Sequence, residues 1–355
     1  MNQKENFGRI VASGIVAAFA AAAAIGPNNA YAEPTMAPRV DYEFTGDISL
    51  GAPNFNDYLT FDAASRRLYV SHVDRVTVVD VASRTLVGSV APLKDSHGMA
   101  IVPKLGKGYA DSGDDGVVKV FNLSDLKIIK QIKVSVDADG MIFDEYTNTV
   151  LVVAGDSKNL TVIDPADDTV TRTVALPGKP EFFAVDGAGN AYINMADTAS
   201  IVKINIKVGT VEATWPLQNC KAPHGLAYDK PSNRLFSGCA NSRLVVVDPS
   251  DGRNVANLPI GSNSDGVSVD SQHRLVFASN GPGTLTAISI APNDQFAVVR
   301  TIPTFFGGRN MTLDPNSGEL FVTHGHMKVL SSMKDVLNLK FGWDGIEVAT
   351  FQPRP

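Results

Sequence analysis

The sequence feature that most constrains the fold is a repeat that ends at a turn-forming position. Its clearest copy is the segment from Pro223 to Asp229, and a second apolar segment that ends at Cys239 follows it closely. The closing aspartate recurs about 40–44 residues apart, and a valine fills one slot. The seven positions are Asp62, Val102, Asp144, Asp186, Asp229, Asp270 and Asp314. Copies at this spacing predict an array of small sheet units.

Each copy reads as four short strands. In the fifth copy they cover residues 225–228, 234–238, 244–248 and 254–259. Runs of Val, Ile, Phe and Tyr favour strands, and clusters of Asp, Asn, Gly, Pro and Ser between them favour turns. No helical period separates the strands, which disfavours a parallel sheet. The sequence therefore predicts an all-β, seven-bladed β-propeller over residues 40–355.

The N-terminal strand is expected to close the ring. Residues 40–50 alternate between apolar and polar, and their ending resembles the outer-strand endings at residues 175–178 and 258–261. We expect this segment to be the outer strand of the last blade, because pairing the first residues with the last removes free sheet edges.

Residues 1–32 are typical of a secretory signal peptide. Lys4 and Arg9 precede an apolar, Ala-rich run over residues 10–25, and Ala30-Tyr31-Ala32 matches a cleavage site. A membrane anchor is the alternative, although the run is short for a span of ~20 residues. We expect residues 33–39 to be a flexible lead-in. The mature protein is expected to be periplasmic or secreted, with no membrane association.

Charge and cysteine content narrow the classes of partner. The formal net charge is −6, and no basic cluster is present. An acidic chain without a basic patch does not attract nucleic acid, so a nucleic-acid partner is excluded. We expect the protein to be a monomer. Cys220 and Cys239 predict one disulfide in an oxidising compartment. The alternative is a soft metal site formed by both thiolates and His224.

The segment Leu68-Tyr69-Val70-Ser71-His72 resembles the YVTN family of β-propeller repeat proteins, and residues 276–280 and 320–324 are variants of it. The third-strand endings at 76–80 and 160–164 fit the same pattern. The resemblance covers the mature chain and implies the propeller fold. Its members look like lactonases, lyases, cofactor-binding subunits and surface-layer proteins alike, so no catalytic residue is implied.

Seven residues share the slot five positions before the closing residue of each copy. In a propeller this slot lies at the start of the innermost strand, at the rim of a central channel. The residues are Asp57, His97, Asp139, Glu181, His224, Asp265 and Arg309. We call them the axial ring. Converging carboxylates repel one another, so the ring favours a cation, a proton or water. The alternative is that these residues form turns or line a wet pore.

One functional hypothesis is a metal-assisted hydrolase acting on a lactone or ester. His97, His224, Asp57 and Asp265 would bind a divalent metal, which would activate water or polarise a carbonyl. Glu181 has the longest carboxylate arm and is the predicted general base. Asp139 and Arg309 are the other two predicted catalytic residues. Arg309 would bind an anionic group of the substrate; the alternative is that it neutralises Asp57 or Asp265.

Two other hypotheses remain open. One is a non-enzymatic binding or scaffold propeller. The other is a periplasmic copper-handling protein whose metal patch lies where the second strands end. Its members would be His72, His324, His326 and Met327, with His72 expected close to His324.

Residues 325–345 interrupt the last blade. They are predicted to form an insertion with a short helix over 331–339, followed by a third strand over 345–351. The six strand-ending aspartates are expected to form turns, and His273 is expected to be a surface residue.

Overall fold

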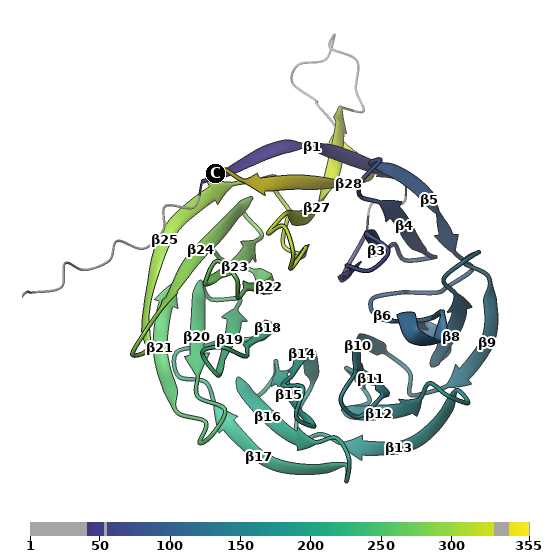
Figure 1. The fold of residues 1–355 in the computed structure, drawn as a ribbon, viewed down its shortest axis with the longest axis horizontal. Coiled ribbons are helices and arrows are strands. Elements are labelled where there is room, and N and C mark those ends of the chain that lie inside the picture. The colour runs from purple at the N-terminus through teal and green to yellow at the C-terminus, as the bar shows by residue number, and fades with distance from the viewer. Residues whose placement is uncertain (1–40, 53–54, 330–340, 355) are drawn as a thin grey trace, which may run out of the picture. The chain divides into compact units, whose positions relative to one another are not determined.

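The computed structural model describes residues 41–52, 55–329 and 341–354, although the side chains of 326–329 and 341–344 are not described. The predicted signal peptide (1–32), lead-in (33–39) and insertion helix (331–339) lie outside the described residues. Seven four-stranded antiparallel sheets are arranged as the blades of a β-propeller, as predicted (Figure 1). Two short 3-10 turns, η1 (Pro103–Leu105) and η2 (Gly113–Asp115), are the only helical elements of the described residues.

The first six blades are each built from four consecutive strands, numbered from the axis outwards. Blade 1 contains β2 (Leu59–Asp62), β3 (Arg67–Ser71), β4 (Val76–Asp80) and β5 (Thr85–Val90). Blade 2 contains β6 (Met99–Val102), β7 (Lys107–Ser112), β8 (Val117–Asn122) and β9 (Ile128–Lys133). Blade 3 contains β10 (Ala138–Asp144), β11 (Thr149–Ala154), β12 (Asn159–Asp164) and β13 (Thr169–Ala175).

Blade 4 contains β14 (Pro180–Val185), β15 (Asn190–Met195), β16 (Ser200–Asn205) and β17 (Thr210–Pro216). Blade 5 contains β18 (Pro223–Asp229), β19 (Arg234–Cys239), β20 (Arg243–Val247) and β21 (Asn254–Pro259). Blade 6 contains β22 (Ser264–Asp270), β23 (Leu275–Asn280), β24 (Thr284–Ala291) and β25 (Gln295–Pro303). The predicted strands of the fifth repeat agree with blade 5 to within a few residues.

Blade 7 joins the two ends of the chain, as predicted. Its strand order is β1-β28-β27-β26, with β1 (Tyr42–Gly51) on the outside and β26 (Met311–Leu313) innermost. Strand β26 also contacts β2 of the first blade, which completes the ring. Because β1 pairs with residues 346–353 of β28, the first strand of the described chain completes the last blade.

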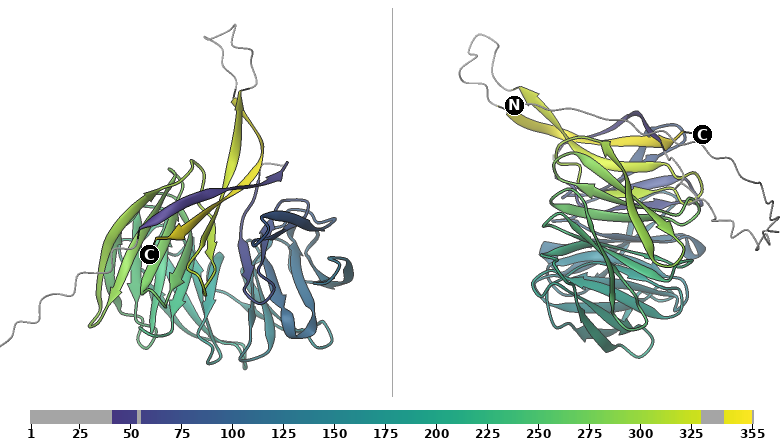
Figure 2. Two further views of the ribbon diagram at one scale, coloured as in Figure 1. Left: turned by 45° about the horizontal axis from the view of Figure 1, so that its top comes forward. Right: turned by 90° about the vertical axis from the view of Figure 1, so that its left-hand side faces the viewer.

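The hairpin of blade 7 is longer than predicted. Strand β27 (Leu320–Val329) continues past His324, and β28 (Phe341–Pro353) extends the predicted third strand at both ends. His326 therefore lies in a strand, opposite Gly345, rather than in a loop. Figure 2 shows this hairpin reaching beyond the rest of its blade.

The core lies between the blades. The second and third strands are buried on both faces, which explains their nearly continuous apolar runs. One apolar cluster joins blades 3 and 4 through Leu151, Leu160, Phe183 and Ile193. Outer strands such as β5 are mostly exposed. Each blade thus depends on its neighbours for burial, and the ring folds as one body of stacked sheets.

The strand-ending aspartates form turns, which confirms their predicted role. Each of the six accepts a hydrogen bond from a backbone N–H two or three residues further along the chain. They recur because every repeat needs the same turn. His273 donates its backbone N–H to Asp270 in this way, and its side chain is 39% exposed.

Candidate functional site

The seven residues of the axial ring lie at the starts of the innermost strands. Four of them are joined by ion pairs. Nδ1 of His224 lies 3.3 Å from Oε2 of Glu181 and 3.2 Å from Oδ1 of Asp265. Nε of Arg309 lies 3.1 Å from Oδ2 of Asp265. Bonding to Asp265 and Glu181 raises the pKa of His224 to about 10. The imidazole is therefore charged at neutral pH and bridges blades 4 and 6 from blade 5.

His97 is held by a residue that the repeat slots did not reveal. Its Nδ1 lies 3.5 Å from Oδ2 of Asp111, and its Nε2 lies 3.8 Å from Oδ1 of Asp95. Oδ1 of Asp111 accepts the backbone N–H groups of His97 and Gly98. Burial is the largest single effect and opposes the imidazolium, but bonding to Asp111 together with the charges of Asp111, Asp139 and Asp57 outweighs it and raises the pKa of His97 to about 10. Asp111 is fully buried, and burial raises its pKa to about 6.

Asp57 and Asp139 are the two ring carboxyls without an ion pair to any described residue. Burial, with repulsion from Asp265, raises the pKa of Asp57 to about 7. Burial, with repulsion from Asp57, holds the pKa of Asp139 well above its usual range. Asn310 Nδ2 donates to Oδ1 of Asp57 at 3.1 Å. Oδ1 of Asp139 is buried and has no hydrogen-bond partner among the described residues.

Two aromatic rings lie next to the axial ring in sequence and in space. Tyr58 follows Asp57, Phe182 follows Glu181, and their ring centroids are 4.9 Å apart. Burial, and then the charge of Asp139, holds the pKa of Tyr58 well above its usual range. The pair borders two cavities. One, of about 80 Å³, is also lined by Asp265, Asn310 and Met311. The other, of about 510 Å³, extends along the innermost strands to Asp62 and Glu145.

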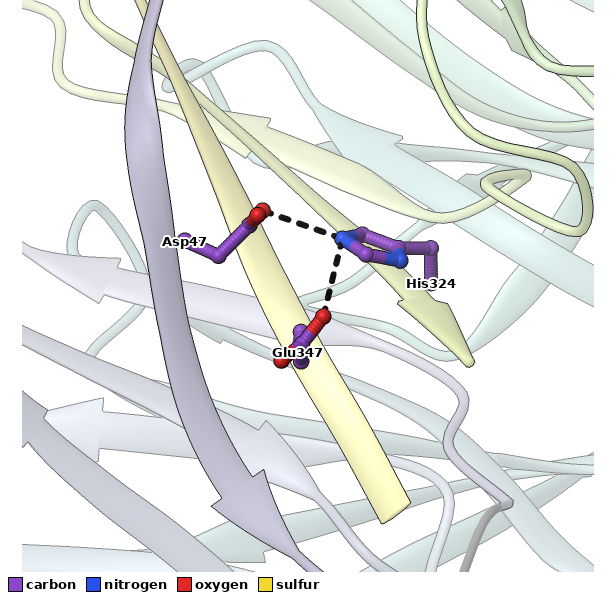
Figure 3. A group of neighbouring side chains, drawn as sticks. All are labelled: Asp47, His324 and Glu347. Atoms are coloured by element: carbon purple, nitrogen blue, oxygen red, sulfur yellow. Dashed lines mark hydrogen bonds and ion pairs between the residues drawn. The ribbon is translucent and has the colours of Figure 1, made fainter. Parts of the chain in front are cut away.

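Two histidines of the predicted outer patch have contacts that the structure describes. His72 is fully buried, and its Nδ1 lies 3.0 Å from Oγ1 of Thr77. His324 faces Asp47 and Glu347 in the closing blade (Figure 3). The expected closeness of His72 to His324 stays a prediction. The side chains of His326 and Met327 lie outside the described residues.

Within the described residues, one group of three His, Cys, Asp or Glu side chains has all its potential metal-ligand atoms within 4.8 Å of one another. Its members are Asp47, His324 and Glu347. The predicted set His97, His224, Asp57 and Asp265 is not gathered as tightly and stays a prediction. The sequence analysis missed Asp47 and Glu347 because neither lies at an equivalent position of the repeat. Only the residue-by-residue pairing of strands β1, β28 and β27 could have identified them.

Cys220 and Cys239 lie at disulfide distance, with their sulfur atoms 2.08 Å apart and their Cα atoms 5.5 Å apart. A disulfide leaves no thiolate for a metal, so the alternative site with His224 is not formed. Cys239 pairs in register with Pro223, the residue before His224. The bond therefore anchors the turn that presents His224 to the axis.

Comparisons with known proteins identify the fold only. No protein-family model matches the chain, and no curated protein matches it by sequence. Within the described residues, no helix has the length and hydropathy needed to cross a bilayer. Among solved structures, one similar chain comes from "Kuenenia stuttgartiensis Hydrazine Synthase", with a TM-score of 0.67 and 15% identity. The match covers 81% of this chain and 95% of that chain, and it shows the shared β-propeller architecture.

Proposed function

We propose that the protein binds a small cation at its axial ring. The observation that carries this proposal is the pair Asp57 and Asp139, two buried carboxyls that make no ion pair with a described residue, the charge of the first raising the pKa of the second. A cation between them would relieve the repulsion and supply the missing partner of Asp139 Oδ1.

The surroundings limit the size and chemistry of the cation. The cavity of about 80 Å³, lined by Asp265 of the axial ring and by Tyr58, which follows Asp57, has room for an ion or a few non-hydrogen atoms. Carboxylates suit divalent metals such as calcium and manganese. The faces of Tyr58 and Phe182 also suit an organic ammonium group through cation–π attraction. The proposed ligand is therefore a divalent metal ion or a small ammonium compound.

Calorimetric titration tests this proposal. Untagged, chelator-treated protein is titrated with calcium, manganese, zinc and methylammonium, alongside the Asp57→Asn/Asp139→Asn variant. Saturable binding of one of these cations that the double variant abolishes supports an axial site. Asp114→Asn/Asp251→Asn, which removes two exposed carboxylates, serves as the charge-matched control. Absence of saturable binding, or equal binding by the double variant, would leave the scaffold hypothesis in place.

A second candidate is hydrolysis of a lactone or ester at the same ring. It is favoured by the pKa of Asp57, which lies near neutrality, where general acid–base catalysis is most effective. Glu181 was the predicted base, but it contacts His224, so Asp57 is the better proton carrier. A panel of lactones and aryl esters, assayed with Asp57→Asn and Glu181→Gln, separates the two roles. Lack of turnover on the whole panel would count against an enzyme.

We further propose YVTN-family membership and export. The resembling segments 68–72, 276–280 and 320–324 fall on the second strands of blades 1, 6 and 7, with His72 one residue beyond the end of β3. The signal-like N-terminus and the paired cysteines support an oxidising compartment. Mass spectrometry of the secreted protein tests export, since a mature chain should begin at Glu33.

A further inference from the structure

We propose that Asp47, His324 and Glu347 bind a transition-metal ion of the zinc type, which joins the two ends of the chain where the ring closes. The three residues come from neighbouring strands of blade 7 (Figure 3). His324 is on β27, Glu347 is on β28 and Asp47 is on β1. The site is separate from the axial ring and its proposed ligand.

The strand register places these side chains on one face of the sheet. His324 and Glu347 are directly opposite each other, and Glu347 is directly opposite Ser49. Asp47 precedes Ser49 by two residues, so its side chain points to the same face as Glu347. Backbone pairing alone therefore brings an imidazole and two carboxylates together.

The distances fit a metal of small radius. Nε2 of His324 lies 3.1 Å from Oδ1 of Asp47 and 3.9 Å from Oε2 of Glu347. In a tetrahedral zinc site with ligand bonds of about 2.0–2.2 Å, neighbouring ligand atoms are about 3.3–3.6 Å apart. Small rotations of the two carboxylates would bring the three donors to these separations.

The second nitrogen of His324 is placed as a metal ligand requires. Nδ1 lies 3.4 Å from the backbone oxygen of Gly325, to which it can donate a proton. That hydrogen bond would leave the Nε2 lone pair facing two carboxylate oxygens. Three electron donors turned toward one point are relieved by a cation between them, which is either a metal ion or the proton of an Nε2–H that donates to Asp47. Donation from the remote ring nitrogen to a carbonyl is also the usual support of a metal-bound histidine.

The imidazole is shielded and held in one orientation. His324 is 4% exposed, and Phe305 stacks on it with ring centroids 4.1 Å apart and planes 15° apart. Asp47 and Glu347 are more accessible, with side chains 31% and 21% exposed. A metal could enter from the carboxylate side, while the fixed ring supplies the soft ligand.

The test uses the untagged full-length protein after dialysis against a chelator. Titration with zinc should show one site per chain outside the axial ring, and cobalt substitution should give the strong visible absorption of a tetrahedral centre. We expect Asp47→Asn or Glu347→Gln to weaken binding at this site by on the order of 100-fold. Glu43→Gln, on the same strand as Asp47 and 54% exposed, is the matched control and should bind normally.

Three results would overturn the proposal. The first is the absence of a zinc site outside the axial ring, and the second is a zinc affinity that is unchanged in both Asp47→Asn and Glu347→Gln. The third is a nitrogen NMR spectrum in which His324 keeps a proton on Nε2 with zinc present, since the group would then be an ordinary ion pair. Binding that survives in Asp57→Asn/Asp139→Asn separates this site from the axial one. His324 itself is left unchanged because a substitution at so buried a residue could disturb folding.

Discussion

The rings of Tyr58 and Phe182 meet at the axis of the propeller, with centroids 4.9 Å apart and planes inclined by 46°. They come from blades 1 and 4, and each immediately follows an acidic member of the axial ring. The carboxyl groups therefore lie next to an aromatic pair, which reduces their contact with water and raises the cost of ionising them.

Removing the ring of Phe182 should make the carboxyl of Asp57 more acidic. In Phe182→Ala we expect the pKa of Asp57 to fall from about 7 toward its usual range, because burial is the largest cause of its shift. Carbon NMR of the aspartate carboxyls across a pH titration measures this directly. Phe306→Ala removes a ring that is 71% exposed and should leave the titration unchanged. An unaltered pKa of Asp57 in Phe182→Ala would assign the shift to its charged neighbours alone.

Asp57→Asn should stabilise the protein at high pH. The folded-state pKa of about 7 lies above the usual 3.8, so the native carboxyl keeps a proton that the unfolded chain has already lost. Wild-type stability therefore falls as the pH rises from about 4 to about 7, and the amide variant avoids this loss. We expect an advantage of about 2–4 kcal/mol at pH 8 that disappears near pH 4. Urea unfolding at both pH values measures it.

The groups that set this pH dependence are Asp265, His97, Arg309 and Glu181, with Asp265 the largest charge effect. Asp57→Asn also removes a charge that raises the pKa of His97 and of Asp139, so the variant changes those two pKa values as well. A stability difference independent of pH would contradict the assignment to Asp57.

His224→Asn should destabilise the protein, and its effect should be greatest at low pH rather than at high pH. The folded-state pKa of about 10 is above the usual 6.5, so the stabilisation by Asp265 and Glu181 is complete below about pH 6.5. It is lost as the pH rises through about 10. We expect the variant to be less stable by about 2 kcal/mol at pH 7, after allowance for partial exposure, and close to wild type above pH 10. His273→Asn, which removes one ion pair between a partly exposed imidazole and the buried Asp270, should cost less.

The fold and the membership of the axial ring follow from the sequence because the repeat places equivalent residues at equivalent points. The proximity of Glu181, His224 and Asp265 needs only this periodicity. Asp111 lies on a second strand, and Tyr58 is one residue beyond the ring slot, so neither belongs to the pattern that was compared across copies. Their roles depend on side-chain directions, which spacing alone does not provide.

The closing blade also depends on a structural detail that the repeat spacing does not provide. Its existence was predictable from the ending of residues 47–51, but its register was not. The meeting of Asp47 with Glu347 depends on one residue-by-residue pairing between strands 300 positions apart in the chain. A shift of one residue would turn Asp47 to the other face of the sheet.

Loss of the disulfide should weaken the fold around His224. Cys220→Ser/Cys239→Ser opens a loop of 19 residues, and we expect a cost of ~3 kcal/mol in the free energy of unfolding. Both cysteines are buried in the cluster between blades 4 and 5, so the serines add a burial penalty. Cys220→Ala/Cys239→Ala separates that penalty from the cross-link. Equal stability of wild type and the alanine variant would mean that the cross-link itself contributes nothing.

Removal of β1 should open the ring. A chain that begins at residue 52 lacks Tyr42, Ile48 and Leu50, all buried, and leaves β28 without its outer partner. Ile48 and Leu50 also pack against blade 1, so the loss reaches both sides of the junction. We expect a broader melting transition and self-association through the exposed edge, measured by calorimetry and light scattering. A chain that begins at residue 41 keeps β1 and is the control. Because a peptide of residues 41–52 can pair with the vacant edge, adding it should restore a sharp transition, and a truncated chain that melts as sharply as the control without the peptide would show that β1 is dispensable for closure.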